Sequence, residues 1–360
     1  MSFLIFLDGA ERFVGCMLGG AAGDALGYLI EYVDLKTIHK KYGPYGLRTV
    51  LKLEANGKRG IISDDTQLAL FTADGLLWAK YDGLAPEEGL YRSYMRWYYT
   101  QTERIIRPEH ARWMKKQAHE ESLGYDLMGE PLLFARRAPG KACLIALASG
   151  LRFTKEKKAN ACKSSAALRT GPVGLFYAGD ADAAFAVGCR AALLTHGGAT
   201  AYLAAGTFSA VISLLAAGKT LGQAVVGAFE RLQQEEGGVE LWKTLQAAVD
   251  EAMSDRNPVR SMKKLGLGWN ADEALALSLY CVMKTTSLKD AVIMACNQDG
   301  DSDTCGAVSG SIAGALYGAK DVPKNWLTHM ECLDLLQGLA KGLYEQGLGS
   351  AAAEPEETDE

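Results

Sequence analysis

The chain has 360 residues, a formal net charge of -5 and an isoelectric point near 5.7. Its length suits one large domain or two ordinary ones, with enough residues to bury a substantial core. The acidic balance and the lack of a dense Lys/Arg stripe argue against nucleic-acid binding through a basic surface.

The eight cysteines are dispersed and form no CxxC pair, and six of them lie among small or apolar residues. This pattern favours a reduced protein over a disulfide scaffold, so we expect a cytoplasmic location. The apolar run 3–7 has no preceding basic residue and is too short for a signal peptide.

The composition is that of a helical protein, with abundant Ala, Leu and Gly, nine prolines and almost no β-branched alternation. Ser63 is expected to cap a helix that begins at Asp64 or Asp65, and apolar residues at helical spacing follow over 68–78. The same spacing predicts helices over 271–283 and 326–344. We therefore predict an all-α fold.

Two stretches are predicted to lie in the core. Residues 191–218 contain no charged side chain and are long enough to cross a bilayer, but His196 and the Gly197–Gly198 break favour a buried helix and no membrane contact. Aromatic residues at near-helical spacing over 78–99 are more typical of core packing than of a stacking surface.

No Pro/Ser-rich linker divides the chain. The predicted connections near 54–60, 104–110, 136–141 and 234–238 are short enough to lie inside one domain. We therefore expect a single domain over 1–350, followed by a disordered acidic tail over 351–360.

Glycine recurs at every fourth residue in two segments. One series runs from Gly15 to Gly27 and the other from Gly306 to Gly318. Because glycine inside a helix costs about 1 kcal/mol relative to alanine, we expect backbones to pass close to one another there, or to a ligand. Each series adjoins acidic residues: Asp24 lies within the first, and 299–303 precede the second.

Two acidic clusters lie more than two hundred residues apart, at 63–66 (Ser-Asp-Asp-Thr) and 299–304 (Asp-Gly-Asp-Ser-Asp-Thr). Carboxylates beside hydroxyls suit Mg²⁺ or Mn²⁺ better than zinc. The second cluster resembles the start of an EF-hand, but Gly310 stands where the loop would need its bidentate glutamate. If the fold joins the clusters, it builds a metal site for a hydrolase or transferase, with the bond that is broken left open.

The order of six motifs resembles the ADP-ribosylglycohydrolase family. The opening G-C-M-L-G-G-A-A-G-D-A-L-G with its following glutamate, both metal motifs, an R-T-G-P-V-G-L segment, a T-H stretch and a G-W-N-A-D-E-A-L block all match in sequence. They lie at Gly15–Glu31, Ser63–Thr66, Leu168–Leu175, Leu194–Tyr202, Gly268–Leu275 and Gly300–Thr304.

This resemblance implies a single-domain orthogonal helical bundle with a central cleft that holds two Mg²⁺ or Mn²⁺ ions. It also implies the metal ligands, which are Ser63, Asp64, Asp65, Asp301, Asp303 and Thr304. Asp65 and Glu31 are both open as the catalytic base, while Asp24 is expected to be structural.

By the same resemblance, the candidate substrate contacts are Arg169, His196, Tyr202, Trp269 and Asp299. Asp299 departs from the family pattern, which usually has glycine there, and so adds a negative charge beside the metals. His196 taken alone is more often a satisfied core residue than a ligand.

The resemblance implies a hydrolase that releases ADP-ribose from a modified acceptor, with ADP-ribosylated arginine on proteins as the first choice. The alternatives are serine-linked ADP-ribose, O-acetyl-ADP-ribose, ADP-ribosylated nucleic acid, a metal phosphohydrolase, and a non-catalytic ADP-ribose binder. The expected partner is an ADP-ribosylated protein or a small ADP-ribose conjugate.

Overall fold

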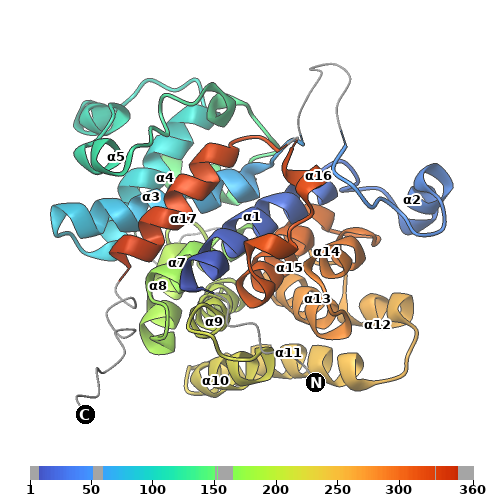
Figure 1. Cartoon of the computed structure of the whole chain (residues 1–360). Helices are drawn as coiled ribbons and strands as arrows, with labels where there is room; N and C mark the ends of the chain where they lie inside the picture. Colours follow the sequence, from blue (N-terminus) through green and yellow to red (C-terminus); the bar gives the residue numbers. More distant parts are fainter. Residues whose placement is uncertain (1–7, 52–59, 151, 153–164, 329, 348–360) are drawn as a thin grey trace, which may run out of the picture.

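The computed structural model describes residues 8–51, 60–150, 152, 165–328 and 330–347. These residues form seventeen α-helices and no strand, so the all-α prediction is confirmed (Figure 1). An isolated parallel bridge joins Gly60 to Met330. The predictions for the 351–360 tail and for most of the 54–60 connection fall outside the described residues.

The helices are joined mostly by short turns, with four 3-10 segments at Pro108–Met114, Pro131–Phe134, Ser165–Leu168 and Ala319–Asp321. Their bounds are α1 (Gly9–Gly27), α2 (Leu35–Tyr42), α3 (Asp64–Asp82), α4 (Pro86–Gln101), α5 (Ala118–Leu123), α6 (Lys141–Ser149), α7 (Gly171–Phe176), α8 (Ala181–Leu193), α9 (Ala199–Ala216), α10 (Leu221–Gln233), α11 (Gly238–Met253), α12 (Pro258–Leu265), α13 (Ala271–Lys284), α14 (Leu288–Cys296), α15 (Ser302–Tyr317), α16 (Lys324–Leu327) and α17 (Leu333–Gln346).

Two helix predictions are confirmed and one is wrong. Helix α3 begins at Asp64, and the Ser63 hydroxyl accepts a hydrogen bond from the Asp65 N–H at 3.1 Å. Helix α13 covers the predicted 271–283. The predicted helix 326–344 is instead split into α16 and α17. The Glu331 N–H leaves the helical pattern to bond the Gly60 carbonyl at 3.1 Å, and Cys332 is left-handed with φ 55°.

The uncharged stretch 191–218 is also split, because α8 ends at Leu193 and α9 begins at Ala199, after the double glycine. Among the described residues, α9 alone is long and apolar enough to cross a membrane. However, 78% of it is buried inside the protein, as expected for a core helix. The aromatic residues predicted to be core are buried too: Trp78, Tyr91, Tyr94, Trp97, Tyr98 and Tyr99.

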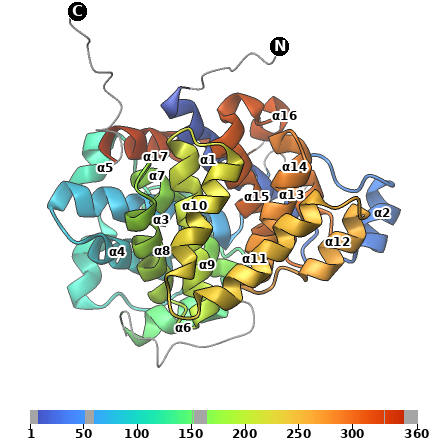
Figure 2. The same ribbon diagram turned by 90° about the horizontal axis from the view of Figure 1, so that it is seen from below.

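Helices α1 and α15 pack against each other backbone to backbone, in antiparallel directions (Figures 1 and 2). A methyl group added to Gly19 would lie 2.3 Å from the Gly310 carbonyl oxygen, and one on Gly23 would lie 1.9 Å from that of Gly306. Neither distance leaves room for a side chain. The two glycine series therefore face each other, and close backbone approach explains them.

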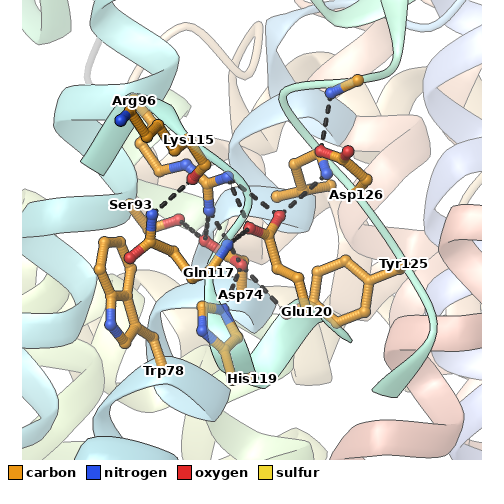
Figure 3. Close-up of polar contacts among 12 residues, drawn as sticks. Asp74, Trp78, Ser93, Arg96, Lys115, Gln117, His119, Glu120, Tyr125 and Asp126 are labelled. Atoms are coloured by element: carbon orange, nitrogen blue, oxygen red, sulfur yellow. Dashed lines mark hydrogen bonds and ion pairs between the residues drawn. The ribbon is translucent and has the colours of Figure 1, made fainter. Parts of the chain in front are cut away.

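A buried ion cluster ties α3 and α4 to the segment that contains α5 (Figure 3). The Arg96 guanidinium lies between two carboxylates, 3.2 Å from Asp74 and 2.8 Å from Glu120, and His119 Nε2 lies 2.8 Å from Asp74. These side chains are almost completely buried. Burial alone would raise the pKa of Asp74, but Arg96, His119 and Ser93 outweigh it and lower this pKa to about 2.

The close contact of the two glycine series predicts that one added methyl group there destabilises the folded protein. In Gly310→Ala the new Cβ would stand 2.0 Å from the Gly19 carbonyl oxygen. We expect the free energy of unfolding to fall by about 2 kcal/mol, because overpacking outweighs the gain in helix propensity. Chemical denaturation measures this change.

Gly338→Ala on α17 is the matched control, since no atom lies within 4 Å of the added Cβ. We expect it to be neutral or to stabilise the protein by up to ~1 kcal/mol. Equal effects of the two substitutions would contradict the close α1–α15 contact.

The ion cluster predicts that Arg96→Met destabilises the protein in a pH-dependent way. Removing the guanidinium that lies between Asp74 and Glu120 leaves these buried carboxylates poorly compensated, at a cost of about 3–5 kcal/mol near neutral pH. The wild-type contribution of Asp74 is present above its unfolded-state pKa of about 3.9 and is lost as the pH falls towards 2. The stability difference between variant and wild type should therefore shrink on acidification, and a pH-independent difference would contradict an ionic role.

Candidate active site

The two acidic clusters meet at a single cavity, as predicted. Its volume is about 90 Å³, and we call it the acidic cavity. Its walls come from the turn after α1, the first turns of α3 and α15, the 138–140 loop and the segment before α13. The acidic and hydroxyl side chains that line it include Glu31, Asp64, Asp65, Asp301, Asp303 and Thr304.

The α1–α15 contact sets one wall of the acidic cavity. A methyl group on Gly27 would lie 2.2 Å from the Ser302 carbonyl oxygen and 2.5 Å from the Asp303 nitrogen, so the end of α1 rests on the start of α15. The turn that follows α1 brings Glu31 to the second cluster. Carboxylate oxygens of Glu31, Asp301 and Asp303 lie within 4.8 Å of one another.

Asp24 fixes the start of α3, which forms another wall of the cavity. Its Oδ2 accepts hydrogen bonds from the Ser63 N–H at 2.9 Å, from the Thr66 N–H at 3.2 Å and from the Thr66 hydroxyl. Asp24 is completely buried, and burial raises its pKa to about 6 despite these donors. Its contacts give it the structural role that we expected, because it holds the first turn of α3 against α1.

One direct hydrogen bond joins the two clusters, and others hold their carboxylates in place. The Thr304 hydroxyl donates to Asp65 Oδ2 at 2.7 Å, and the Asp301 carboxylate caps α15 by accepting the Thr304 N–H at 3.3 Å. Asp64 Oδ2 accepts the Gly140 N–H at 3.0 Å. Ser63 caps α3 behind this surface and is not among the described residues that line the cavity.

The cavity concentrates negative charge in a buried place. Burial raises the pKa of Asp64 to about 8, although the Gly140 N–H opposes this. Burial also raises the pKa of Asp65 and Asp303 well above the usual range, and each neighbouring carboxylate adds to the effect. Within the described chain no Lys, Arg or His side chain lines the cavity.

This donor set fits a divalent cation. Converging carboxylates repel one another unless protons or a cation compensate them, and their oxygen atoms are the ligands that Mg²⁺ and Mn²⁺ prefer. Glu31, Asp301 and Asp303 converge most closely, and further oxygens come from Asp64, Asp65 and Thr304.

The predicted substrate contacts separate into those at the cavity and those behind it. Trp269 lines the acidic cavity, with its ring stacked 5.1 Å from that of Tyr32. Arg169 is buried behind the cavity, where it donates to the Ala166 carbonyl at 2.7 Å and to the Thr195 hydroxyl at 2.7 Å. His196 Nδ1 lies 2.9 Å from the same hydroxyl. Arg169 and His196 therefore share a polar network beneath the site.

Two other predicted contacts lie outside the lining of the cavity. Tyr202 sits half-buried on α9, packed against the core. The expectation that Asp299 adds a negative charge beside the metals is wrong, because its carboxylate is paired with groups away from the cluster. Its Oδ1 accepts the Leu35 N–H at 2.7 Å, and its Oδ2 lies 3.2 Å from Lys263 Nζ. These partners draw the side chain towards α2 and α12.

Sequence reasoning missed Tyr32 and Ala138, which also line the acidic cavity. Both have a left-handed backbone, with φ of 64° and 54° respectively, and they are two of the three such non-glycine residues in the described chain. Residues held in this region of conformational space cluster at functional sites. No sequence signal marks either residue, because neither is a glycine, asparagine or aspartate, the residue types that most often take this conformation.

The fold and site define an α-helical protein with a carboxylate-lined cavity whose donor atoms suit a divalent cation. The sequence model of the ADP-ribosylglycohydrolase family matches residues 7–352. The chain therefore belongs to the ADP-ribosylglycohydrolase family and is a hydrolase of the kind that acts on ADP-ribose linkages.

Individual relatives agree with this assignment. An uncharacterized protein of Archaeoglobus fulgidus is 24% identical over 347 residues, which cover 93% of this chain and 96% of the relative. ADP-ribosylarginine hydrolase Tri1 of Serratia proteamaculans is 35% identical over 72 residues, or 20% of each protein. A solved ADP-ribosylglycohydrolase-related protein complex shares the fold, with a TM-score of 0.63, 22% identity and coverage of 94% of this chain and 99% of that chain.

The acidic cavity predicts that a divalent cation stabilises the folded protein. Adding Mg²⁺ or Mn²⁺ should raise the melting temperature, since a ligand at 100 times its Kd contributes about 2.7 kcal/mol. The shift should be lost in Asp303→Asn and retained in Asp299→Asn, because the Asp299 carboxylate lies outside the cavity. Thermal unfolding measures both. A shift that depends equally on Asp303 and Asp299, or no shift, would contradict the site.

Proposed function

We propose that this chain removes ADP-ribose from an ADP-ribosylated side chain of a protein, with arginine as the first acceptor, and that it uses two Mg²⁺ or Mn²⁺ ions. Family membership supplies the kind of linkage. The observation that carries the proposal is the convergence of Glu31, Asp301 and Asp303 in a cavity that no described Lys, Arg or His side chain lines. The name of the Serratia relative and the Thr195-His196 motif support arginine.

If cations bind, the residues on the different walls of the cavity would act as ligands to different ions. Glu31, Asp301 and Asp303 would hold one ion, and Asp64, Asp65 and Thr304 offer oxygens for a second. Bound ions would supply a fixed positive charge and Lewis acidity. The hydrogen bond from Thr304 to Asp65 would keep the two ligand segments in register, because it joins α3 to α15.

Two carboxylates are candidates for proton transfer during hydrolysis. Asp65 lines the acidic cavity and is held in place by the Thr304 hydroxyl, so it would be one candidate to accept a proton from an attacking water. Glu31 is only half-buried at the edge of the cavity and is the rival candidate. The remaining negative charge would stabilise the oxocarbenium-like centre that develops at the anomeric carbon.

Two further features support this proposal: one concerns the cell compartment and the other concerns catalysis. The seven described cysteines are all free, which supports a reducing cytoplasm. All six predicted ligand positions keep oxygen-bearing side chains, and five of them line the acidic cavity. Retention of the complete set favours catalysis over a binding role without chemistry.

Product analysis tests the proposal. The protein is incubated with Mg²⁺ and, separately, with ADP-ribosylated arginine, ADP-ribosylated serine and O-acetyl-ADP-ribose, and products are identified by mass. We expect free ADP-ribose from the arginine conjugate, with a loss of at least 100-fold in kcat/KM in Asp303→Ala, since groups at metal sites contribute several kcal/mol.

The other products each point to a different function. AMP would indicate cleavage at phosphate and would contradict the proposal. Faster release from serine or acetyl conjugates would move the acceptor away from arginine while keeping the reaction. Activity that is unchanged by chelation of divalent cations would contradict the role of the acidic cavity.

A further inference from the structure

One end of this acidic protein carries a cluster of unpaired positive charge. Residues 35–48 contain four Lys/Arg and no Asp/Glu, and residues 256–264 contain another four and again no Asp/Glu. The first segment is α2 with its following turn, and the second contains α12. Figures 1 and 2 both show α2 and α12 at the same end of the molecule.

Three of these eight cations are neutralised locally. Arg256 and Lys264 pair with Glu251 at 2.9 and 2.6 Å, and Lys263 pairs with Asp299 at 3.2 Å. The remaining five are exposed and form no ion pair within the described chain: Lys36, Lys40, Lys41, Arg48 and Arg260.

One of these cations, Arg48, lines a hollow of about 350 Å³, which we call the basic groove, and Arg260 follows the lining residue Val259 on α12. The groove runs between the 45–48 turn, the start of α12 and the side of α14. Its lining is mainly apolar, with Met262, Ile293 and Met294. Tyr45 stands at its edge with 74% of its surface exposed, and the Arg48 guanidinium lies 5.7 Å from its ring centre.

One carboxylate, Asp290, also lines the basic groove. It is used locally, because its Oδ2 accepts the Ser287 hydroxyl at 2.8 Å as α14 begins. The groove therefore combines an apolar floor with Arg48 at its edge, and the other four unpaired cations stand on α2 and α12 at the same end of the molecule.

The basic groove continues towards the acidic cavity. A smaller hollow shares Val259, Met262 and Asn297 with the groove and extends to Leu267 and Asp299. Leu267 in turn accepts the Asp301 N–H at 2.8 Å, and Asp301 lines the acidic cavity. The backbone at Leu267 therefore connects the lining of the smaller hollow to that of the acidic cavity.

We propose that the basic groove docks an acidic peptide segment of the ADP-ribosylated protein and presents the neighbouring modified side chain to the acidic cavity. This inference rests on the proposed function for its substrate. Apolar side chains of the segment would contact the methionine-lined floor, which adapts to varied shapes. Asp and Glu residues that flank them would pair with the five free cations.

The apolar floor favours a peptide over a nucleic acid. A phosphate backbone needs a continuous row of cations, and base stacking needs several exposed rings. This end of the molecule offers five dispersed cations, and the groove itself has one exposed tyrosine and a floor of Met and Ile. The net charge of -5 also opposes a polyanion outside this end of the molecule.

Steady-state kinetics tests this docking. Two ADP-ribosylated arginine peptides of equal length are compared, one flanked by Asp, Glu and Leu and one by Ser and Gly, with free ADP-ribosylarginine as the small substrate. We expect the acidic peptide to have a KM roughly tenfold lower than the neutral one at low salt, with similar kcat. The difference should fade as salt is added.

A charge-reversal pair separates docking from general charge effects. Lys41→Glu with Arg48→Glu should abolish the preference for the acidic peptide and leave turnover of free ADP-ribosylarginine unchanged. Lys115→Glu with Lys116→Glu is the matched control, because these exposed lysines precede α5 at the opposite end of the molecule (Figure 1). Equal effects of both pairs, or no peptide preference in the wild type, would overturn the proposal.

Direct binding keeps the test independent of catalysis. Fluorescence anisotropy with the unmodified acidic peptide should show binding that weakens about tenfold in the Lys41/Arg48 variant. If free ADP-ribosylarginine is not hydrolysed, the proposed function fails, and this measurement still decides the docking. Tighter binding of a single-stranded RNA than of the peptide, competing at the same surface, would overturn the choice of partner.

Discussion

The backbone contact between α1 and α15 is the constraint on which the site depends. Glycines on both helices allow carbonyl groups to approach where any side chain would collide, as Gly23 and Gly306 do. Because the helices run antiparallel, the end of α1 meets the start of α15 at Gly27 and Ser302. The turn after one helix and the cap of the other then hold Glu31 beside Asp301 and Asp303.

The buried carboxylates form two kinds of site, which differ in whether a cationic side chain balances their charge. At Arg96 the buried carboxylates have a cation and hydrogen bonds, so the pKa of Asp74 falls and the cluster stabilises the fold. In the acidic cavity the carboxylates lack such a partner in the described chain, so burial raises the pKa of Asp65 and Asp303. An arrangement that is costly by itself is typical of a site built for a ligand.

Local sequence rules predicted the parts of the site better than their surroundings. The Ser63 cap and the tight glycine packing follow from capping and helix period. The meeting of the two clusters was implied by the family resemblance, because ligand chemistry left it conditional on the fold. The direction of Asp299 follows from no local rule, because the partners that draw it away lie at 35 and 263. The break before α17 also depends on a distant group, since the Glu331 N–H bonds Gly60. The left-handed backbone of Tyr32, with φ of 64°, has no signal in the local sequence either.

Anomalous diffraction from crystals of the protein grown with Mn²⁺ tests the central claim most directly. We expect an anomalous peak in the acidic cavity, about 2.0–2.3 Å from oxygens of Glu31, Asp301 and Asp303, which is the distance of a metal ligand. The same map would place any second ion against Asp64 and Asp65. A cavity without a peak, with manganese bound elsewhere on the protein, would contradict the assignment of this site as the metal centre.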